Sequence, residues 1–152
     1  MPAESYHLNL GESALIMREG SIHILGIGSC IGLFLHDRVA AIAAACHVVY
    51  PHHTDPKLPC SNANMAVEVL ISQLIASGAK VRRLQAHIIG GANLLSLRHD
   101  NIGQENTQKV ESKLKEYGIT IVTKEVGDKV GRSASFFLPS GQLQFRTLRA
   151  NR

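Results

Sequence analysis

The chain has 152 residues, a length that suits one domain built around one hydrophobic core. Because 45% of the residues are hydrophobic and charges of both signs are mixed, a globular fold is favoured over disorder. The net charge of +4 comes from scattered residues and only 5% of the residues are aromatic, which disfavours a nucleic-acid-binding surface. We expect a single domain over residues 1–152 with no nucleic acid as a partner.

No segment of the sequence predicts secretion or membrane insertion. The long apolar run over residues 39–50 is too short to span a bilayer. Residues 1–10 are polar and mixed, unlike the apolar core of a secretory signal. An odd number of cysteines without a CxxC spacing argues against a disulfide framework and a structural zinc site. We therefore expect a cytoplasmic protein with free thiols at Cys30, Cys46 and Cys60.

Apolar runs separated by turn residues predict about eight strands. Residues 14–18 and 22–27 flank a turn at Glu19-Gly20, and a short hairpin at residues 36–38 joins strand 31–35 to strand 39–49. Later strands are predicted over residues 81–89, 119–122, 133–138 and 143–148.

Two helices complete the predicted elements. Ser61 or Asn62 can cap the first helix, because a side-chain oxygen there accepts from otherwise unpaired N–H groups, and Gly78 ends it. The second helix is predicted over residues 104–117, with Val110 and Leu114 on its apolar face. Because strands and helices do not alternate strictly, the pattern indicates an α+β fold.

A cysteine lies on a glycine-rich bend between two predicted strands, in the segment Gly26-Ile-Gly-Ser-Cys-Ile-Gly32. The glycines leave no Cβ to obstruct a ligand that approaches the backbone. The segment fails the dinucleotide-binding fingerprint, because Ile31 occupies the place of the third glycine. It fits G-x-C-x-G, a thiol version of the nucleophile elbow, although a strand and not a helix is predicted next. Inert packing of Cys30 is the alternative to nucleophilic chemistry.

A histidine ends an apolar strand seventeen residues after this cysteine, at His47. A thiol and a nearby imidazole are the two parts that a cysteine nucleophile needs. Cys46 precedes His47 directly, and adjacent strand residues point to opposite faces, so we expect Cys30 and not Cys46 to share a site with His47. The alternative is a core histidine that is hydrogen-bonded to a carbonyl group.

Further glycines follow a later strand, at Gly90-Gly91. Such a turn either presents its N–H groups to a ligand or is merely a tight corner. We take Gly28, Ser29, Gly90 and Gly91 as candidates for binding the oxyanion or the substrate.

The proline-rich loop over residues 51–59 carries side chains that bind metals in other proteins. They lie in or next to the loop at His52, His53, Asp55 and Cys60. Their spacing matches no familiar metal-binding motif, so an exposed polar loop is the better interpretation. We expect no metal and no cofactor.

Several segments match one family in the same order along the chain: Leu25–Cys30, Ala45–His47, Asn62–Leu74, Ile88–Asn93, Asn101–Asn106 and Gly131–Ser133. With these segments the chain resembles the CheD family, the chemoreceptor glutamine deamidases of bacterial chemotaxis. The most specific part is L-G-x-G-S-C followed by a histidine seventeen residues later.

The resemblance implies a hydrolase that converts selected glutamines of methyl-accepting chemoreceptors to glutamate through a thioester. It implies that Cys30 is the nucleophile and His47 the general base, with the thiol pKa lowered by the pairing. A weak methylesterase activity and the phosphatase CheC as a regulatory partner are implied as well. The implied fold is a two-sheet β-sandwich with helices packed on one side, three layers shared with the catalytic domain of cytotoxic necrotizing factor.

The chain departs from the family pattern at Ile24. The family has a threonine six residues before the cysteine, as a third catalytic residue, and isoleucine has no hydroxyl. His23 does not replace it, because it is expected to face away from Ile24. We expect a main-chain carbonyl near Ile24 to accept the His47 N–H instead. The alternative function is a catalytically weak or inactive adaptor that binds receptors or CheC.

Overall fold

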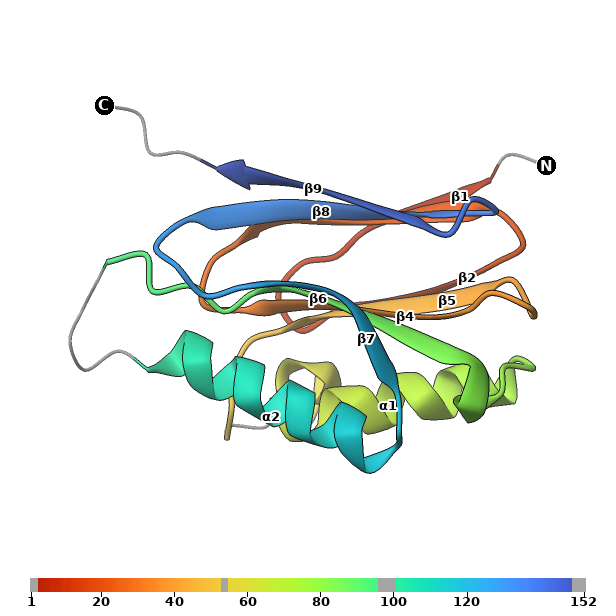
Figure 1. Ribbon diagram of the computed structural model, residues 1–152, viewed down its shortest axis with the longest axis horizontal. Helices are drawn as coiled ribbons and strands as arrows, with labels where there is room; N and C mark the ends of the chain where they lie inside the picture. The colour runs from red at the N-terminus through yellow and green to blue at the C-terminus, as the bar shows by residue number, and fades with distance from the viewer. Residues whose placement is uncertain (1–2, 53–54, 96–100, 149–152) are drawn as a thin grey trace.

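Two β-sheets stack face to face, and two helices cover the outer side of one of them (Figure 1). The structure, a computed structural model, describes residues 3–52, 55–95 and 101–148. The layers follow in the order helices, five-stranded sheet and four-stranded sheet. The predicted α+β class and the sandwich with helices on one side are therefore confirmed.

The four-stranded sheet is one outer layer. Its strands lie in the order β1 (Glu4–His7), β3 (Gly20–Ile27), β8 (Gly131–Leu138) and β9 (Gln142–Leu148). β1 and β3 are parallel, and the other neighbours are antiparallel. The ladder between β3 and β8 is irregular between Ile24 and Ile27, where Gly26 has a φ of +64°. Such a bulge bends its strand, and here it directly precedes the turn that carries Cys30.

The five-stranded sheet is the middle layer. Its strands lie in the order β2 (Ser13–Met17), β5 (Ile42–Val48), β4 (Ile31–Asp37), β6 (Leu84–Gly90) and β7 (Thr120–Val126). Only β6 and β7 are parallel neighbours. Because β4 is the central strand, the chain passes from Cys30 directly into the middle of this sheet.

The two helices, α1 (Ala63–Ala76) and α2 (Ile102–Glu116), pack against the five-stranded sheet. Short 3-10 turns, η1 (Pro59–Ser61) and η2 (Val81–Arg83), precede α1 and β6. The Asn62 side-chain oxygen accepts hydrogen bonds from the N–H groups of Asn64, at 2.8 Å, and Met65, at 3.2 Å. One of the two predicted caps is thereby confirmed, and it fixes the start of α1.

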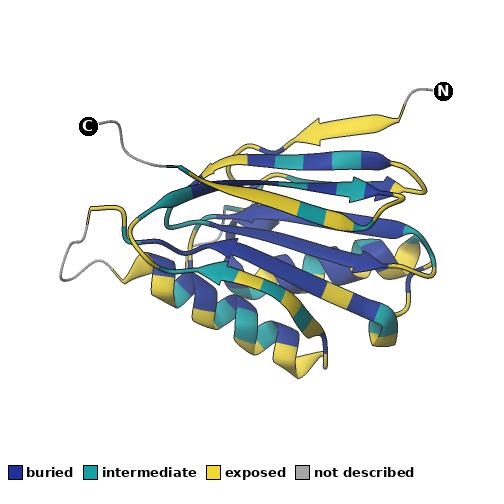
Figure 2. Cartoon of the chain, turned by 45° about the horizontal axis from the view of Figure 1, so that its top comes forward, coloured by how far each residue is buried: buried dark blue, intermediate teal, exposed yellow. Residues whose placement is uncertain are grey.

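The central strands β4 and β5 are buried at every position (Figure 2). Alternate residues belong to two hydrophobic cores. Leu33 and Cys46 face the helices, and Phe34 and Ala45 face the four-stranded sheet. Because both faces of these strands are covered, their sequences are continuous apolar runs and do not alternate between apolar and polar residues.

Some predicted boundaries differ from the structure. β1 was not predicted, because its short segment is polar and exposed along its length. Residues 81–83 form η2 and not the start of β6, and β7 extends to Val126. The predicted strand 39–49 is wrong at its start, since β5 begins at Ile42. The buried Asp37 carboxylate accepts the Ala40 N–H at 3.0 Å and so holds residues 38–41 in a turn.

A stacked pair of buried histidines, His36 and His87, lies between the sheets at the end of β4 remote from Cys30. The ring centroids are 5.3 Å apart, and His87 Nδ1 is hydrogen-bonded to Thr123 Oγ1 at 2.7 Å. Burial, and after it the neighbouring His36, lower the pKa of His87 from 6.5 to about 4.

We expect this pair to destabilise the protein in mild acid. The pKa of His87 is lower in the folded chain than in the unfolded chain. Between pH 6.5 and about pH 4, the unfolded chain therefore binds a proton that the folded chain does not. The free energy of unfolding should drop by about 3 kcal/mol across this range. Thermal unfolding measured from pH 7 to pH 4 tests this. In His87→Gln the free energy of unfolding should depend less on pH over this range. An equal pH dependence in the natural protein and the variant would contradict the role given to His87.

Candidate active site

Cys30 lies in the turn between β3 and β4, half-buried against the core that separates the two sheets. Two main-chain hydrogen bonds hold this turn to the residues after β6. The Gly91 N–H donates to the Cys30 carbonyl at 2.8 Å, and the Ala92 N–H donates to the Gly28 carbonyl at 2.9 Å. The two predicted glycine segments are therefore in direct contact.

Gly90 needs its small size for this contact. Its φ is +121°, and a Cβ at this position would overlap the carbonyl oxygen of Cys30. The glycine turn after β6 thus sets how closely the Cys30 turn approaches the sheet.

His47 lies on β5 directly opposite Gly32 of β4, and it is buried. Its side chain faces the space between the sheets, as that of Ala45 does, whereas Cys46 faces the helices. The prediction that Cys46 and His47 point to opposite faces is confirmed. Cys30 stands two residues before Gly32, in the turn that leads into β4, and its side chain packs against the same core between the sheets.

The His47 ring is oriented by the main chain. Its Nδ1–H donates to the Leu8 carbonyl at 3.3 Å, because a carbonyl oxygen can only accept. The Leu8 N–H in turn donates to the His23 carbonyl at 2.9 Å, which places Leu8 beside Ile24. The expected main-chain acceptor near Ile24 is therefore confirmed, as the carbonyl of Leu8. His47 Nε2 is buried and makes no hydrogen bond within residues 3–52, 55–95 and 101–148.

Burial shifts the pKa values of Cys30 and His47 in the directions that favour their neutral forms. It raises the pKa of the Cys30 thiol above its ordinary value. It lowers the pKa of His47, against a smaller opposite effect of the hydrogen bond to the Leu8 carbonyl. The expectation of a lowered thiol pKa is therefore wrong for this structure, because burial dominates and His47 Nε2 forms no hydrogen bond to the thiol. Both shifts therefore favour a neutral thiol beside a neutral imidazole at pH 7.

Ile24 is fully buried in the core between the sheets. Its Cδ1 lies 3.4 Å from the place where a Cβ on Gly32 would stand, and Gly32 is the residue opposite His47. The aliphatic side chain thus lies against the residue of β4 that pairs with His47. His23 points to the other side of β3, where its ring nitrogens are hydrogen-bonded to Ser135 and Ser21. The prediction that His23 cannot replace the missing threonine is confirmed.

The turn leaves main-chain donors free around the thiol. In the described part of the chain, the N–H groups of Ser29 and Cys30 make no hydrogen bond. The Gly91 N–H, by contrast, is already bonded to the Cys30 carbonyl. Binding of substrate by Gly28, Ser29, Gly90 or Gly91 stays a prediction.

Arg132 of β8 reaches between the sheets and is buried, although sequence reasoning assigned it no role. Its Nη1 donates to the carbonyl oxygens of Gly127, at 2.7 Å, and Gly90, at 3.3 Å. It therefore ties the ends of β6 and β7 together behind the Cys30 turn. The sequence does carry a signal for this position. Alternate residues of a strand face the same side, so Arg132 is expected to face the core as Ala134 and Phe136 do.

Asn106 of α2 is a second buried polar residue to which sequence reasoning assigned no role, although it lies in the matching segment Asn101–Asn106. Its Nδ2 donates to the carbonyls of Ser29 and Val49, each at 3.0 Å. The sequence carries one signal for this residue. Asn106 lies four residues before Val110, so it is a polar residue on the apolar face of the helix.

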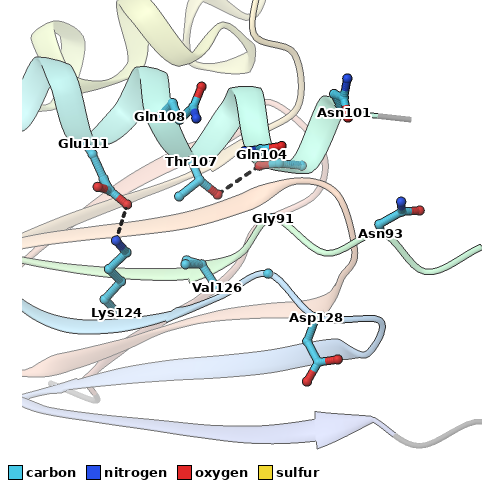
Figure 3. A pocket seen from close by; sticks show the side chains of 12 residues that line it. Gly91, Asn93, Asn101, Gln104, Thr107, Gln108, Glu111, Lys124, Val126 and Asp128 are labelled. Atoms are coloured by element: carbon cyan, nitrogen blue, oxygen red, sulfur yellow. Dashed lines mark hydrogen bonds and ion pairs between the residues drawn. The ribbon is translucent and has the colours of Figure 1, made fainter. Parts of the chain in front are cut away.

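A cavity of about 530 Å³ opens between the first turns of α2 and the end of β7, beside Gly91 (Figure 3). Inside it, the Thr107 hydroxyl donates to the Gly103 carbonyl of its own helix at 2.9 Å. Neither Cys30 nor His47 lines this cavity. It therefore adjoins the Cys30 turn from the helix side without containing Cys30 or His47.

Other site classes find no support in the part of the chain that the structure describes. There, no group of three or more His, Cys, Asp or Glu side chains could hold a metal ion. His52 pairs instead with Glu105 at 3.0 Å, while His53 lies outside the described residues. No helix within those residues is long and apolar enough to cross a membrane.

We expect Cys30 to react fastest among the three thiols. Cys60 has a lowered pKa, chiefly through its hydrogen bond with Cys46, but both are almost inaccessible, at 2% and 0% exposure. Alkylation needs access as well as thiolate, so iodoacetamide should label Cys30 first in the folded protein, faster at higher pH. Peptide mapping after partial labelling measures this, and preferential labelling of Cys60 would contradict it.

Comparisons with known proteins identify the family of this chain. The family described as CheD chemotactic sensory transduction matches residues 50–147. A protein of Thermotoga maritima named chemoreceptor glutamine deamidase CheD is 36% identical over 142 residues, which cover 91% of this chain and 89% of the relative. A protein of the same name from Halalkalibacterium halodurans is 35% identical and covers 84% of each chain. A probable chemoreceptor glutamine deamidase CheD from Caldanaerobacter subterraneus is 28% identical and covers 97% of this chain and 96% of its own. This chain therefore belongs to the CheD family.

Proposed function

We propose that this protein hydrolyses the side-chain amide of selected glutamines in bacterial chemoreceptors, with Cys30 as nucleophile and His47 as general base. The observation that carries the proposal is that Cys30 and His47 face the same end of the space between the sheets. The names of the relatives supply the reaction and the substrate class. The free Nε2 of His47 supplies the base that the reaction requires.

The first half of the reaction transfers the acyl group to sulfur. His47 Nε2 accepts the proton of the Cys30 thiol, and the sulfur attacks the amide carbon of glutamine. The carbonyl oxygen becomes an oxyanion, for which the free N–H of Cys30 is a donor worth about 3 kcal/mol in such sites. The tetrahedral intermediate then expels ammonia, which takes the proton from His47. A thioester between Cys30 and the receptor side chain results.

The second half returns the enzyme to its resting state. His47 Nε2 accepts a proton from water, and the hydroxide formed attacks the thioester carbon. The Cys30 sulfur leaves and regains a proton, and the receptor keeps a glutamate. The same steps would cleave a methyl ester, so we also propose a weak methylesterase activity. From family resemblance alone we further propose CheC as a regulatory partner and the cytoplasm as the place of action.

A second candidate function is a catalytically weak adaptor that binds receptors or CheC. The observations that favour it are the isoleucine at position 24 and the absence of a hydrogen bond between the Cys30 thiol and His47. Ammonia release from cytoplasmic receptor fragments separates the two functions. The deamidase should release ammonia in proportion to the glutamate formed, whereas an adaptor should bind the fragments and release none. Free glutamine and short glutamine amides serve as controls for a general amidase.

Ile24→Thr should change the rate of deamidation by less than about tenfold, or ~1.4 kcal/mol of barrier. The Leu8 carbonyl already accepts from His47 Nδ1, and Nε2 must stay free for Cys30, so a new hydroxyl finds no vacant role on the ring. The variant should also unfold more easily, since it exchanges buried aliphatic surface for a hydroxyl. Steady-state ammonia release measures the rate. An increase of several orders of magnitude would favour the adaptor function for the natural chain.

A further inference from the structure

One side-chain amide connects the two segments that carry Cys30 and His47. Asn106 is completely buried in α2, and its Nδ2 donates one hydrogen to the Ser29 carbonyl and the other to the Val49 carbonyl, both at 3.0 Å. Ser29 immediately precedes Cys30, and Val49 follows His47 by two residues.

The strand ladder itself stops just short of these carbonyls. β4 and β5 are paired from Asp37 to Ile31, whose partner is Val48. Beyond this pair the strands separate, because the Val49 N–H donates to the Ser61 carbonyl at 2.9 Å and not to the Cys30 turn. The Asn106 amide therefore replaces the next rung of the ladder, at the level of the thiol.

The orientation of the amide is fixed by its neighbours. Both carbonyl groups can only accept, so Nδ2 must face them. Asn106 Oδ1 is then left buried without a hydrogen-bond partner in the described residues. The next residue, Thr107, instead bonds within its own helix (Figure 3). A buried amide with one unsatisfied end is a poor choice for stability alone, and it points to a role for the end that is used.

We infer that Asn106 is a positioning residue that holds the Cys30 turn at a fixed place relative to His47. The inference rests on the proposed Cys–His chemistry and adds a third group to it. Without the amide, the turn keeps its bonds to Gly91 and Ala92 but loses its only hydrogen-bonded link toward β5 among the described residues. The thiol and the imidazole then no longer keep one relative placement, and small displacements of this kind reduce reactivity strongly.

The test compares how much Cys30 reactivity depends on His47 with and without the amide. Iodoacetamide labelling rates of Cys30 are measured at pH 7.5 in the natural chain, His47→Asn, Asn106→Ala and the double variant. We expect His47→Asn to slow labelling about tenfold in the natural background, because the neutral imidazole accepts the thiol proton as the sulfur attacks. In Asn106→Ala it should have almost no further effect, because the two groups are then no longer coupled. An equal effect of His47→Asn in both backgrounds would overturn the inference.

Val110→Ala is the matched control. Val110 is also fully buried on α2, one turn after Asn106. Its side chain packs in the core between the helices and the five-stranded sheet and forms no hydrogen bond to the Cys30 turn. It should leave the dependence of Cys30 on His47 unchanged, although it loosens the same helix. Loss of the dependence in this variant too would assign the effect of Asn106→Ala to general loosening. Asn106→Ser, which keeps one donor and leaves a smaller gap, replaces the alanine variant if that protein does not fold.

Amide hydrogen exchange makes the test independent of the chemistry. The N–H groups of Gly91 and Ala92 donate to the Cys30 turn, so they should exchange at least about tenfold faster in Asn106→Ala and at an unchanged rate in Val110→Ala. Unchanged exchange in Asn106→Ala would overturn the inference even if labelling were altered. If His47→Asn does not slow labelling in the natural background, the proposed Cys30–His47 chemistry is contradicted. The rates of amide hydrogen exchange then test by themselves whether Asn106 holds the Cys30 turn in place.

Discussion

Cys30→Ala should abolish glutamine deamidation, with a loss on the order of 10⁴-fold or more, because no thioester forms without the sulfur. The fold should survive. Cys30 is only half-buried in a turn that main-chain hydrogen bonds to Gly91 and Ala92 hold in place, and these bonds do not involve the side chain. We expect the free energy of unfolding to change by less than about 1 kcal/mol. Ammonia release and thermal unfolding of the same preparation measure the two quantities.

Cys46→Ala is the appropriate comparison for this variant. Its thiol faces the helices and is fully buried, so its removal should lower stability and leave the rate per folded molecule unchanged. Full activity in Cys30→Ala would refute the nucleophile assignment, and loss of activity in Cys46→Ala at unchanged folding would move it to the other thiol.

His47→Asn should lower the rate of deamidation by roughly 10²–10⁴-fold, the usual contribution of a general base. Asparagine can still donate to the Leu8 carbonyl, so the variant removes the free Nε2 while keeping the anchor. The natural protein should lose activity in acid only below pH 6.5, since burial lowers the pKa of His47 and the base must be neutral. This acidic decline should be absent from the residual activity of the variant.

His87→Asn is the matched control for His47→Asn. His87 is also a buried histidine between the sheets, but it lies at the end of β4 remote from Cys30. It should leave the rate per folded molecule and its dependence on pH unchanged near pH 7. A comparable loss in both variants would show that the sandwich, and not the position of one imidazole, limits the reaction.

The placement of Cys30 and His47 on adjoining segments could be predicted from sequence because it is local to β4 and β5. Cys30 precedes an apolar run and His47 ends another, and alternation along β5 separates His47 from Cys46. The supporting contacts could not be predicted in this way. The Leu8 carbonyl is separated from His47 by 39 positions, and Asn106 from Ser29 by 77. Main-chain carbonyls carry no sequence signal, so only the folded chain identifies them as partners.

The directions of the pKa shifts of Cys30 and His47 could not be predicted from the sequence either. A cysteine and a histidine in proximity suggest an ion pair, but the direction of each pKa shift depends on burial and on whether the two groups are hydrogen-bonded. Here burial dominates for both groups, and His47 Nε2 has no partner in the described residues. β1 was missed for a related reason, because a polar, exposed edge strand acquires its pairing only from β3.

Site-resolved deamidation of a receptor tests the central claim most directly. Cytoplasmic receptor fragments are incubated with the natural protein or with Cys30→Ala, and peptide mass spectrometry quantifies glutamate at each original glutamine. We predict conversion at a small set of glutamines with the natural protein, ammonia release in equal amount, and neither with Cys30→Ala. Glutamate formation that is equal with both proteins, or absent with both while the fragments still bind, would contradict a Cys30–His47 deamidase.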